Sequence, residues 1–246
     1  MKRVFFAGLM CMSLSTTAFA GSNTVNMSNF PNNQQLFGDL IKDLGAAMSY
    51  RAVTPAEPLG VLLGIDVGLE LTGTKLKNVD DSWKQATDGN GKTNLYMGKV
   101  HVHKGLPLGI DVGAYYGTVA DSNIKSLGGE VSYAILSGTA VSPALAIRGT
   151  YSKMFGVTDL DLNTAGLELS ISKGFLMLTP YAGVGAVYYN GQGTPGTTNP
   201  KFDSESDTLA KYFLGLNFNM GLMNFAAEAD KTGENSSYSA KVGLRW

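Results

Sequence analysis

The stretch VLLGIDVGLELT, at residues 61–72, alternates between two kinds of side chain. Its odd positions are all apolar, whereas its even positions from Gly64 onward are small, polar or acidic and include Asp66 and Glu70. Because successive side chains of a β-strand point to opposite faces, this pattern predicts a strand that lies between two different surroundings.

The same alternation recurs to the end of the chain. We predict strands near residues 60–74, 94–104, 109–120, 124–137, 143–154, 162–173, 176–189, 207–219, 222–231 and 236–246. Each is about long enough to cross a bilayer when it is tilted. The predicted fold class is all-β: a transmembrane antiparallel up-and-down β-barrel of about ten strands, with roughly 8 to 12 possible, preceded by a short amphipathic helix.

The expected connections differ in length from one end of the strands to the other. Tight turns are predicted at 105–108, near Gly138, at 173–175 and at 220–221, whereas 75–93 and 190–206 are long and polar. Outer-membrane barrels have short periplasmic turns and longer external loops, and the tight turns fall at every second connection. Two external connections, at 121–123 and 232–235, are short exceptions.

Ionisable side chains gather on the face opposite the apolar one. A soluble β-sandwich would have to bury them in an apolar core, where each needs a charged partner or water. A membrane barrel places its apolar face against lipid and its charges in a polar lumen. The residues predicted to face this lumen are Asp66, Glu70, Lys99, His101, His103, Asp111, Glu130, Arg148, Glu168, Lys211, Glu228, Asp230, Lys241 and Arg245.

The first twenty residues have the pattern of a secretory signal peptide. Lys2 and Arg3 precede an apolar run, and Ala18-Phe19-Ala20 is an A-x-A cleavage signature. The single cysteine, Cys11, lies inside this segment, so the mature chain is expected to have no thiol. The formal net charge of -1 gives no sign of a nucleic-acid partner. We expect a signal peptide at 1–20, an N-terminal periplasmic segment at 21–59 and the barrel at 60–246.

Helical periodicity marks one part of the N-terminal segment, near residues 35–49. Apolar residues recur at helical spacing at Leu36, Phe37, Leu40, Ile41, Leu44 and Met48, with Asp39, Lys42 and Asp43 on the opposite side. The first interpretation is a short helix under the periplasmic mouth or on the membrane interface. The second is a plug in the lumen, formed by Phe37, Leu40, Ile41 and Leu44.

The last strand carries a resemblance to a family. Tyr238, Val242, Leu244 and the terminal Trp246 point one way in a strand that resembles the C-terminal strand of Gram-negative outer-membrane proteins. The stretch LTPYAGVG at 178–185 is likewise similar to strands of the small OmpA-like and OmpW-like barrels. The resemblance covers about residues 60–246 and is one of fold. It implies a cell outer-membrane location and insertion by the barrel assembly machinery, which would read the C-terminal residues.

Both histidines of the chain lie in the stretch KVHVHKG at 99–105. The strand pattern places His101 and His103 in the lumen, and a hairpin closed around residues 106–108 would set His103 opposite Asp111. Two imidazoles near carboxylates can bind a divalent ion or titrate near neutral pH. Polar lumen networks are the ordinary content of small barrels, so we expect a structural role here, with no metal and no cofactor.

No pattern in the sequence indicates catalysis. There is no nucleophile elbow, no phosphate-binding glycine loop and no Cys/His metal spacing. We therefore expect a non-enzymatic barrel with a structural or surface-interaction role. A narrow pore or carrier for a small solute, gated by the N-terminal helix, is the alternative, and a barrel hydrolase is the third. Expected partners are outer-membrane lipid and lipopolysaccharide, with the assembly machinery and periplasmic chaperones during biogenesis.

Overall fold

A computed structural model of the chain describes residues 23–193 and 201–246. The signal peptide expected at 1–20 lies outside these residues. The strands are β1 Ile65–Lys75, β2 Asn94–Leu106, β3 Ile110–Val119, β4 Lys125–Ser137, β5 Ala144–Phe155, β6 Leu160–Ser172, β7 Leu178–Gly193, β8 Glu205–Met220, β9 Met223–Thr232 and β10 Asn235–Arg245. The helices are η1 Met27–Asn29, α1 Gln34–Met48, η2 Val79–Trp83, α2 Lys84–Ala86 and η3 Pro107–Gly109.

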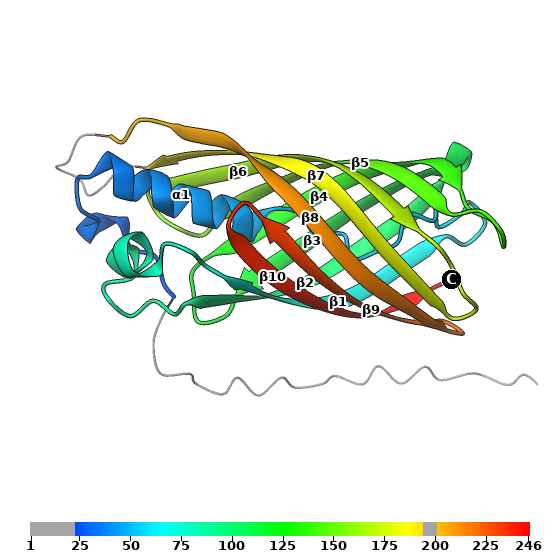
Figure 1. The fold of residues 1–246 in the computed structure, drawn as a ribbon. Helices are drawn as coiled ribbons and strands as arrows, with labels where there is room; N and C mark the ends of the chain where they lie inside the picture. The colour runs from blue at the N-terminus through cyan, green and yellow to red at the C-terminus, as the bar shows by residue number, and fades with distance from the viewer. Residues whose placement is uncertain (1–22, 194–200) are drawn as a thin grey trace, which may run out of the picture.

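The ten strands form a closed barrel, which confirms the predicted fold class. Each strand pairs antiparallel with its neighbour along the chain, and β1 closes the ring by pairing with β10. The long connection 76–93 and residues 201–204, which lead into β8, lie at one end of the barrel, and the tight turns and the C-terminus lie at the other (Figure 1). We call these the long-loop end and the short-turn end.

The barrel wall has an apolar outside and a buried, largely polar inside at the short-turn end. Leu69, Val100 and Leu214 point outward and are 56%, 53% and 66% exposed. Their inward neighbours along the strands, such as Glu70 and Lys99, are buried. The two-residue alternation of the sequence therefore corresponds to the two faces of one wall.

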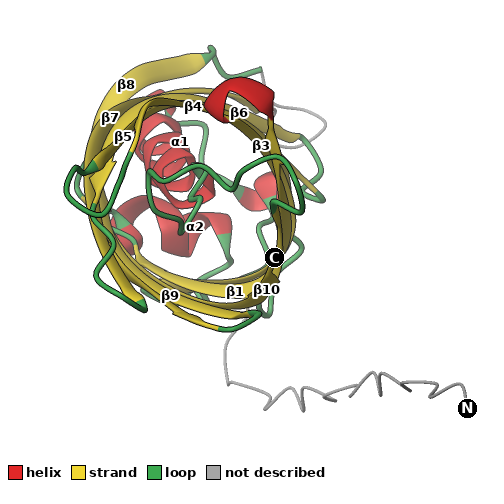
Figure 2. Ribbon diagram, turned by 90° about the vertical axis from the view of Figure 1, so that its right-hand side faces the viewer, coloured by secondary structure: helices red, strands yellow, loops and turns green. Residues whose placement is uncertain are grey.

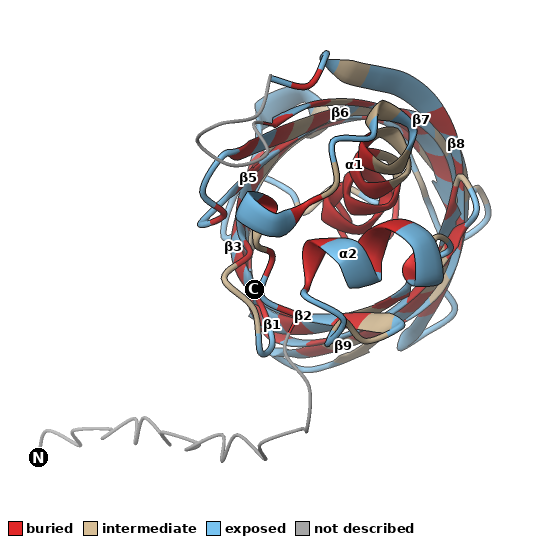
Figure 3. Ribbon diagram, turned by 90° about the vertical axis from the view of Figure 1, so that its left-hand side faces the viewer, coloured by how far each residue is buried: buried red, intermediate tan, exposed pale blue. Residues whose placement is uncertain are grey.

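The N-terminal segment runs through the barrel from one end to the other. The backbone N–H of Asn23 donates to the carbonyl of Asp121 in the β3–β4 connection, at the long-loop end. At the short-turn end, the backbone N–H of Leu59 donates to the Asp111 carboxylate. Figure 2 shows α1 enclosed by the ring of strands. Figure 3 looks into the opening at the long-loop end, which we call the mouth, and shows α1 largely buried there.

This position corrects the first interpretation of the helix, which placed it under the periplasmic mouth or on the membrane interface. Helix amphipathicity is the same whether the apolar face meets lipid or the inner wall of a barrel. The lumen of a ten-stranded barrel is narrow, and the small residues Gly45, Ala46 and Ala47, all buried, keep this part of α1 thin enough to enter it. None of the helices in the described part of the chain is long and apolar enough to span a membrane.

The register predicted between β2 and β3 was wrong by two residues. Leu106 pairs with Ile110 across η3, so the hairpin is centred on Leu108, which has a φ of 66°. His103 therefore pairs with Gly113, and Asp111 pairs with Gly105. A Cβ at position 113 would lie 2.0 Å from Cδ2 of His103, so the imidazole occupies space that only glycine leaves free.

Candidate functional site

The lumen near the long-loop end is filled by an apolar layer around α1. Phe37, Ile41 and Leu44 have no exposed surface. The ring of Phe37 stacks on Phe202 with 4.4 Å between centroids. Other members of this layer include Leu40, Met48, Leu95, Met154, Leu162, Tyr189 and Leu209. The four residues predicted to form a plug thus lie inside the barrel, against its wall.

Glycines let α1 approach the wall closely. A Cβ on Gly191 of β7 would lie 2.4 Å from Cγ2 of Ile41, and one on Gly193 would lie 2.7 Å from the Phe37 ring. On the helix itself, a Cβ on Gly45 would lie 2.8 Å from Cβ of Tyr189. The helix and β7 therefore fit together without spare space.

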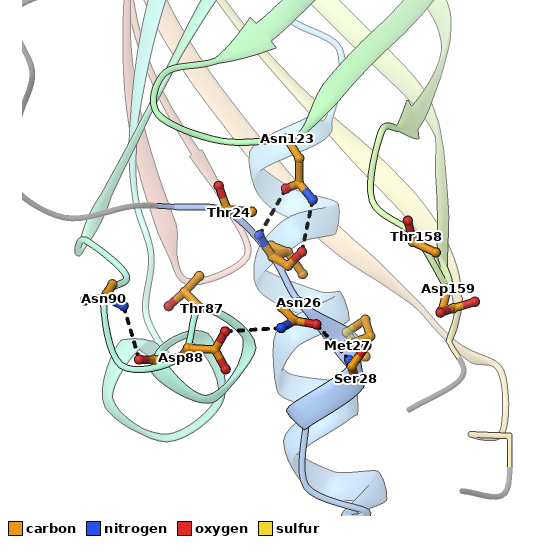
Figure 4. Close-up of a pocket in the computed structure, with 11 residues that line it drawn as sticks. Thr24, Asn26, Met27, Ser28, Thr87, Asp88, Asn90, Asn123, Thr158 and Asp159 are labelled. Atoms are coloured by element: carbon orange, nitrogen blue, oxygen red, sulfur yellow. Dashed lines mark hydrogen bonds between the residues drawn. The ribbon is translucent and has the colours of Figure 1, made fainter. Parts of the chain in front are cut away.

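The start of the described chain is tied to the loops at the mouth. Val25 donates its N–H to Oδ1 of Asn123 and accepts from Nδ2 of the same side chain, both at 3.0 Å. Asn26 donates from Nδ2 to the Asp88 carboxylate at 3.2 Å. These residues line a polar hollow of about 440 Å³ (Figure 4). The N-terminal segment is therefore part of the mouth surface.

One acidic residue joins α1 to these loops. The Asp43 carboxylate accepts from the backbone N–H of Asn78 at 2.7 Å and from Nδ2 of Asn235 at 3.1 Å. Burial raises the pKa of Asp43, and these two hydrogen bonds act against that rise. Asp43 thus anchors the helix to the β1–β2 connection and to the first residue of β10.

Ionisable side chains fill the lumen towards the short-turn end. This charged layer consists of Asp66, Glu70, Lys99, His101, His103, Glu130, Arg148, Glu168, Lys211, Glu228, Asp230, Lys241 and Arg245, together with Arg51 of the N-terminal segment. All are buried except Arg245, which is partly exposed. Asp111, predicted for the same network, is partly buried and contacts Leu59 instead of His103.

Ion pairs link neighbouring strands within the charged layer. Oδ2 of Asp66 accepts from Nζ of Lys241 at 3.1 Å and from Nη2 of Arg245 at 2.6 Å. Oε1 of Glu168 accepts from Nζ of Lys211 at 2.7 Å, and Arg148 lies between Glu168 and Glu130. Opposite charges lie next to each other, which offsets the cost of removing them from water.

Arg51 is the member of this layer that the strand pattern did not predict. Its Nε donates to Oδ1 of Asp230 at 2.5 Å, and its Nη2 donates to Oγ of Ser237 at 2.7 Å. The same guanidinium donates to the carbonyls of Ala46, Ala47 and Ser49 at the C-terminal end of α1. Arg51 therefore caps the helix and pairs it with the wall at once.

Further hydrogen bonds join residues 50–56 of the N-terminal segment to the barrel wall. They join Lys211 Nζ to Tyr50 O at 2.7 Å, Tyr50 Oη to His103 Nε2 at 3.3 Å, Arg148 Nη2 to Thr54 Oγ1 at 3.2 Å and Ala56 N to Ser172 Oγ at 3.1 Å. The cavity between Thr54, His103 and Arg148 holds about 10 Å³, which is about room for one water molecule. At this level the segment fills the lumen.

The residues proposed as an assembly signal lie on the outside of the barrel. Tyr238, Val242, Leu244 and Trp246 are exposed on the outer face of β10 and at its end. The backbone of Trp246 pairs with Ile65 of β1 through two hydrogen bonds. Their recognition by an assembly machinery stays a prediction.

Comparisons with known proteins agree on the kind of fold and go no further. No family model and no curated protein sequence matches this chain. Similar solved structures include the N-terminal β-barrel domain of Pseudomonas aeruginosa OprF, with 13% identity, 73% of this chain and 96% of that chain covered, and a TM-score of 0.38. Neisserial surface protein A has 9% identity, coverage of 74% and 97%, and a TM-score of 0.36.

A third similar structure is the attachment invasion locus protein Ail of Yersinia pestis. It has 14% identity, coverage of 73% and 93%, and a TM-score of 0.30. The resemblance is one of fold alone. At such identities and TM-scores the resemblance assigns no residue role to this chain.

Proposed function

We propose that the chain is a non-enzymatic integral protein of the Gram-negative outer membrane, whose lumen its own N-terminal segment closes. The outward face supports a membrane location. Leu69, Val100, Leu167 and Leu214 belong to a continuous apolar wall surface, much larger than the patches that a soluble monomer leaves exposed. Closure of the barrel pairs the strand edges, as a lipid environment requires.

Aromatic side chains on the outer wall support the same proposal. Near the long-loop end, Tyr96, Tyr116, Tyr151 and Tyr238 are exposed on four different strands. Near the short-turn end, exposed aromatic side chains include Tyr133, Phe175 and Trp246. Two such girdles flank the apolar band of membrane barrels, because the rings suit the level of the lipid headgroups.

The filled lumen is the observation that carries the proposed role. An apolar layer and a charged layer both contact the N-terminal segment, which fills the lumen among the described residues, so we expect the barrel in this state to be closed to solutes. The chain's two histidines are buried on the short-turn side of α1. They lie away from the mouth at the long-loop end, where an outer-membrane hydrolase would meet its substrate. What remains accessible is the polar mouth, and we assign to it the structural or surface-interaction role.

A gated pore for a small solute is the second candidate. The observation that favours it is the nature of the contacts around residues 50–59, which include hydrogen bonds to polar and charged side chains of the wall. Water can replace such contacts at less cost than it can replace apolar packing. Withdrawal of the segment would leave a lumen lined by the charged layer.

Single-channel recording in planar bilayers separates the two candidates. We expect the mature chain to give no current steps and a variant lacking residues 23–57 to give steady ones, because this segment fills the lumen. Openings of the same amplitude in the intact chain would contradict the closed barrel and favour the gated pore. Heat-modifiable migration in gels checks that the deletion variant still forms a barrel.

The N-terminal segment is also expected to reach the cell surface. Because the mature chain has no cysteine, Ser28→Cys, at an exposed position of the mouth, introduces a single thiol. We expect a membrane-impermeant maleimide to label Ser28→Cys on intact cells. Val141→Cys, 91% exposed in a short turn, is the matched control and should react only after the outer membrane is permeabilised. The reverse pattern would overturn the proposed orientation.

A further inference from the structure

We propose that Asp66, His101 and His103 form a binding site for a divalent transition-metal ion, of which zinc is the best match. The three residues lie on the neighbouring strands β1 and β2, where Asp66 pairs with His103 and Gly68 pairs with His101. One donor atom from each lies within 4.8 Å of the other two. All three side chains are buried.

Several buried atoms that could ligate a metal ion have no hydrogen-bond partner at this site. Both ring nitrogens of His101, Nδ1 of His103 and Oδ1 of Asp66 have no hydrogen-bond partner within the described chain. A buried polar atom left in this way costs about 1–3 kcal/mol, and native proteins keep few of them. A bound cation would satisfy the imidazole and carboxylate lone pairs together.

The distances suit a small ion with imidazole and carboxylate ligands. Nε2 of His101 lies 3.5 Å from Oδ1 of Asp66. Two ligands at about 2.0–2.2 Å from a tetrahedral zinc ion are separated by about 3.4 Å. His103 would coordinate through Nδ1, since its Nε2 lies 3.3 Å from the Tyr50 hydroxyl and 3.4 Å from Oε1 of Glu130.

The surroundings orient the carboxylate and balance its charge. Lys241 and Arg245 both donate to Oδ2 of Asp66, which leaves Oδ1 directed to the histidines. Those two cations disfavour a metal ion. On the other side, Glu70 lies 3.8 Å from Nδ1 of His101 and Glu130 lies beside His103, and both favour one. Imidazole with carboxylate is the ligand set that zinc shares with copper and nickel.

A metal ion here would also act on the N-terminal segment. His103 contacts the Tyr50 hydroxyl, and Tyr50 also accepts from Lys211 through its carbonyl. Coordination through Nδ1 fixes the ring of His103 and polarises its Nε2–H, which strengthens the hydrogen bond to the hydroxyl. This site stands independently of the membrane location proposed above.

The test uses the mature chain, purified without a histidine tag so that His101 and His103 remain its only histidines. The protein is refolded into detergent with zinc chloride, desalted and analysed by mass spectrometry of the metal. We expect one zinc ion per chain. His101→Asn is expected to reduce the retained zinc by about tenfold or more, because it removes a ligand. Asp111→Asn, a lumen carboxylate outside the site, should retain it.

Cobalt substitution gives a second readout. We expect the parent chain refolded with cobalt chloride to show the intense visible absorption of a four-coordinate site, and His103→Asn to lose it while still migrating as a folded barrel. Zinc that stays at the parent level in the His101→Asn and His103→Asn double variant would overturn the site. Parent protein that retains no zinc after refolding would overturn it as well.

Discussion

Arg51→Met is expected to weaken the docking of the N-terminal segment by about 3–5 kcal/mol, because the substitution leaves the buried Asp230 carboxylate without its cation. The loss is larger than that of one ion pair. The guanidinium also donates to the carbonyls of Ala46, Ala47 and Ser49 at the C-terminal end of α1. The barrel itself should persist, since its strands pair independently of residue 51.

Limited proteolysis and bilayer recording measure this loss. The N-terminal segment of Arg51→Met should be cleaved more readily than that of the parent, and current steps should appear as it leaves the lumen. Arg51→Lys should fail nearly as badly, because one ammonium cannot reproduce the planar set of donors.

A double variant separates the lost pairing from the lost cap. In Arg51→Met with Asp230→Leu, no unpaired carboxylate remains, so part of the protection should return. Equal protease sensitivity in the single and double variants would show that Asp230 does not carry the effect. If Arg51→Met matched the parent in protease sensitivity and in bilayer recording, Arg51 would not contribute to the closure of the lumen.

The alternation of the sequence predicted the barrel because it reports a strong physical contrast. Each strand separates an apolar outside from a buried inside, so a shift by one residue would expose every charge to the outer face. That contrast placed Glu70, Arg148 and Lys211 inside the lumen, where the structure has them. It says nothing about the offset between neighbouring strands, which depends on the turns.

The β2–β3 hairpin shows that limit. The sequence Leu106-Pro107-Leu108-Gly109 allows closure around 107 or around 108, and these choices differ by two residues in register. Both keep every side chain on its predicted face, so the periodicity is the same for each. Leu108 takes a positive φ of 66°, a conformation that leucine seldom adopts and that local propensity does not predict.

The position of α1 was open for a similar reason. Its apolar side chains fit a membrane surface as well as the inside of a barrel, and the sequence offers no further contrast between them. The position of Arg51 in the lumen could, however, have been inferred from the sequence. The inward face of the strands has more acids than lysines and arginines, so the lumen requires a cation from elsewhere, and Arg51 lies three residues after the apolar Met48 of α1.

Gly45→Leu is expected to expel α1 from the lumen. A Cβ at this position would lie 2.8 Å from Cβ of Tyr189, and the larger leucine side chain has to displace either β7 or the helix. Overpacking of this kind costs about 1–3 kcal/mol, and occasionally more. Leucine also favours helix by about 0.5–1 kcal/mol over glycine, so a loss of docking cannot come from helix propensity.

Gly38→Ala is the matched control on the same helix. Its new Cβ would meet the Glu205 carboxyl group at 3.3 Å, and that flexible side chain can move. We therefore expect Gly38→Ala to be neutral or to stabilise the docked helix by up to about 1 kcal/mol.

In Gly45→Leu, protease cleavage within residues 34–48 and current steps in bilayers should appear together, because the same helix fills the lumen. Adding Tyr189→Gly should reverse both effects, since it removes both the Cβ and the ring that the leucine meets. Cleavage without current would mean that α1 frays while residues 50–59 still close the barrel. The contacts of these residues with the charged layer, including those of Arg51, would then be what closes the lumen.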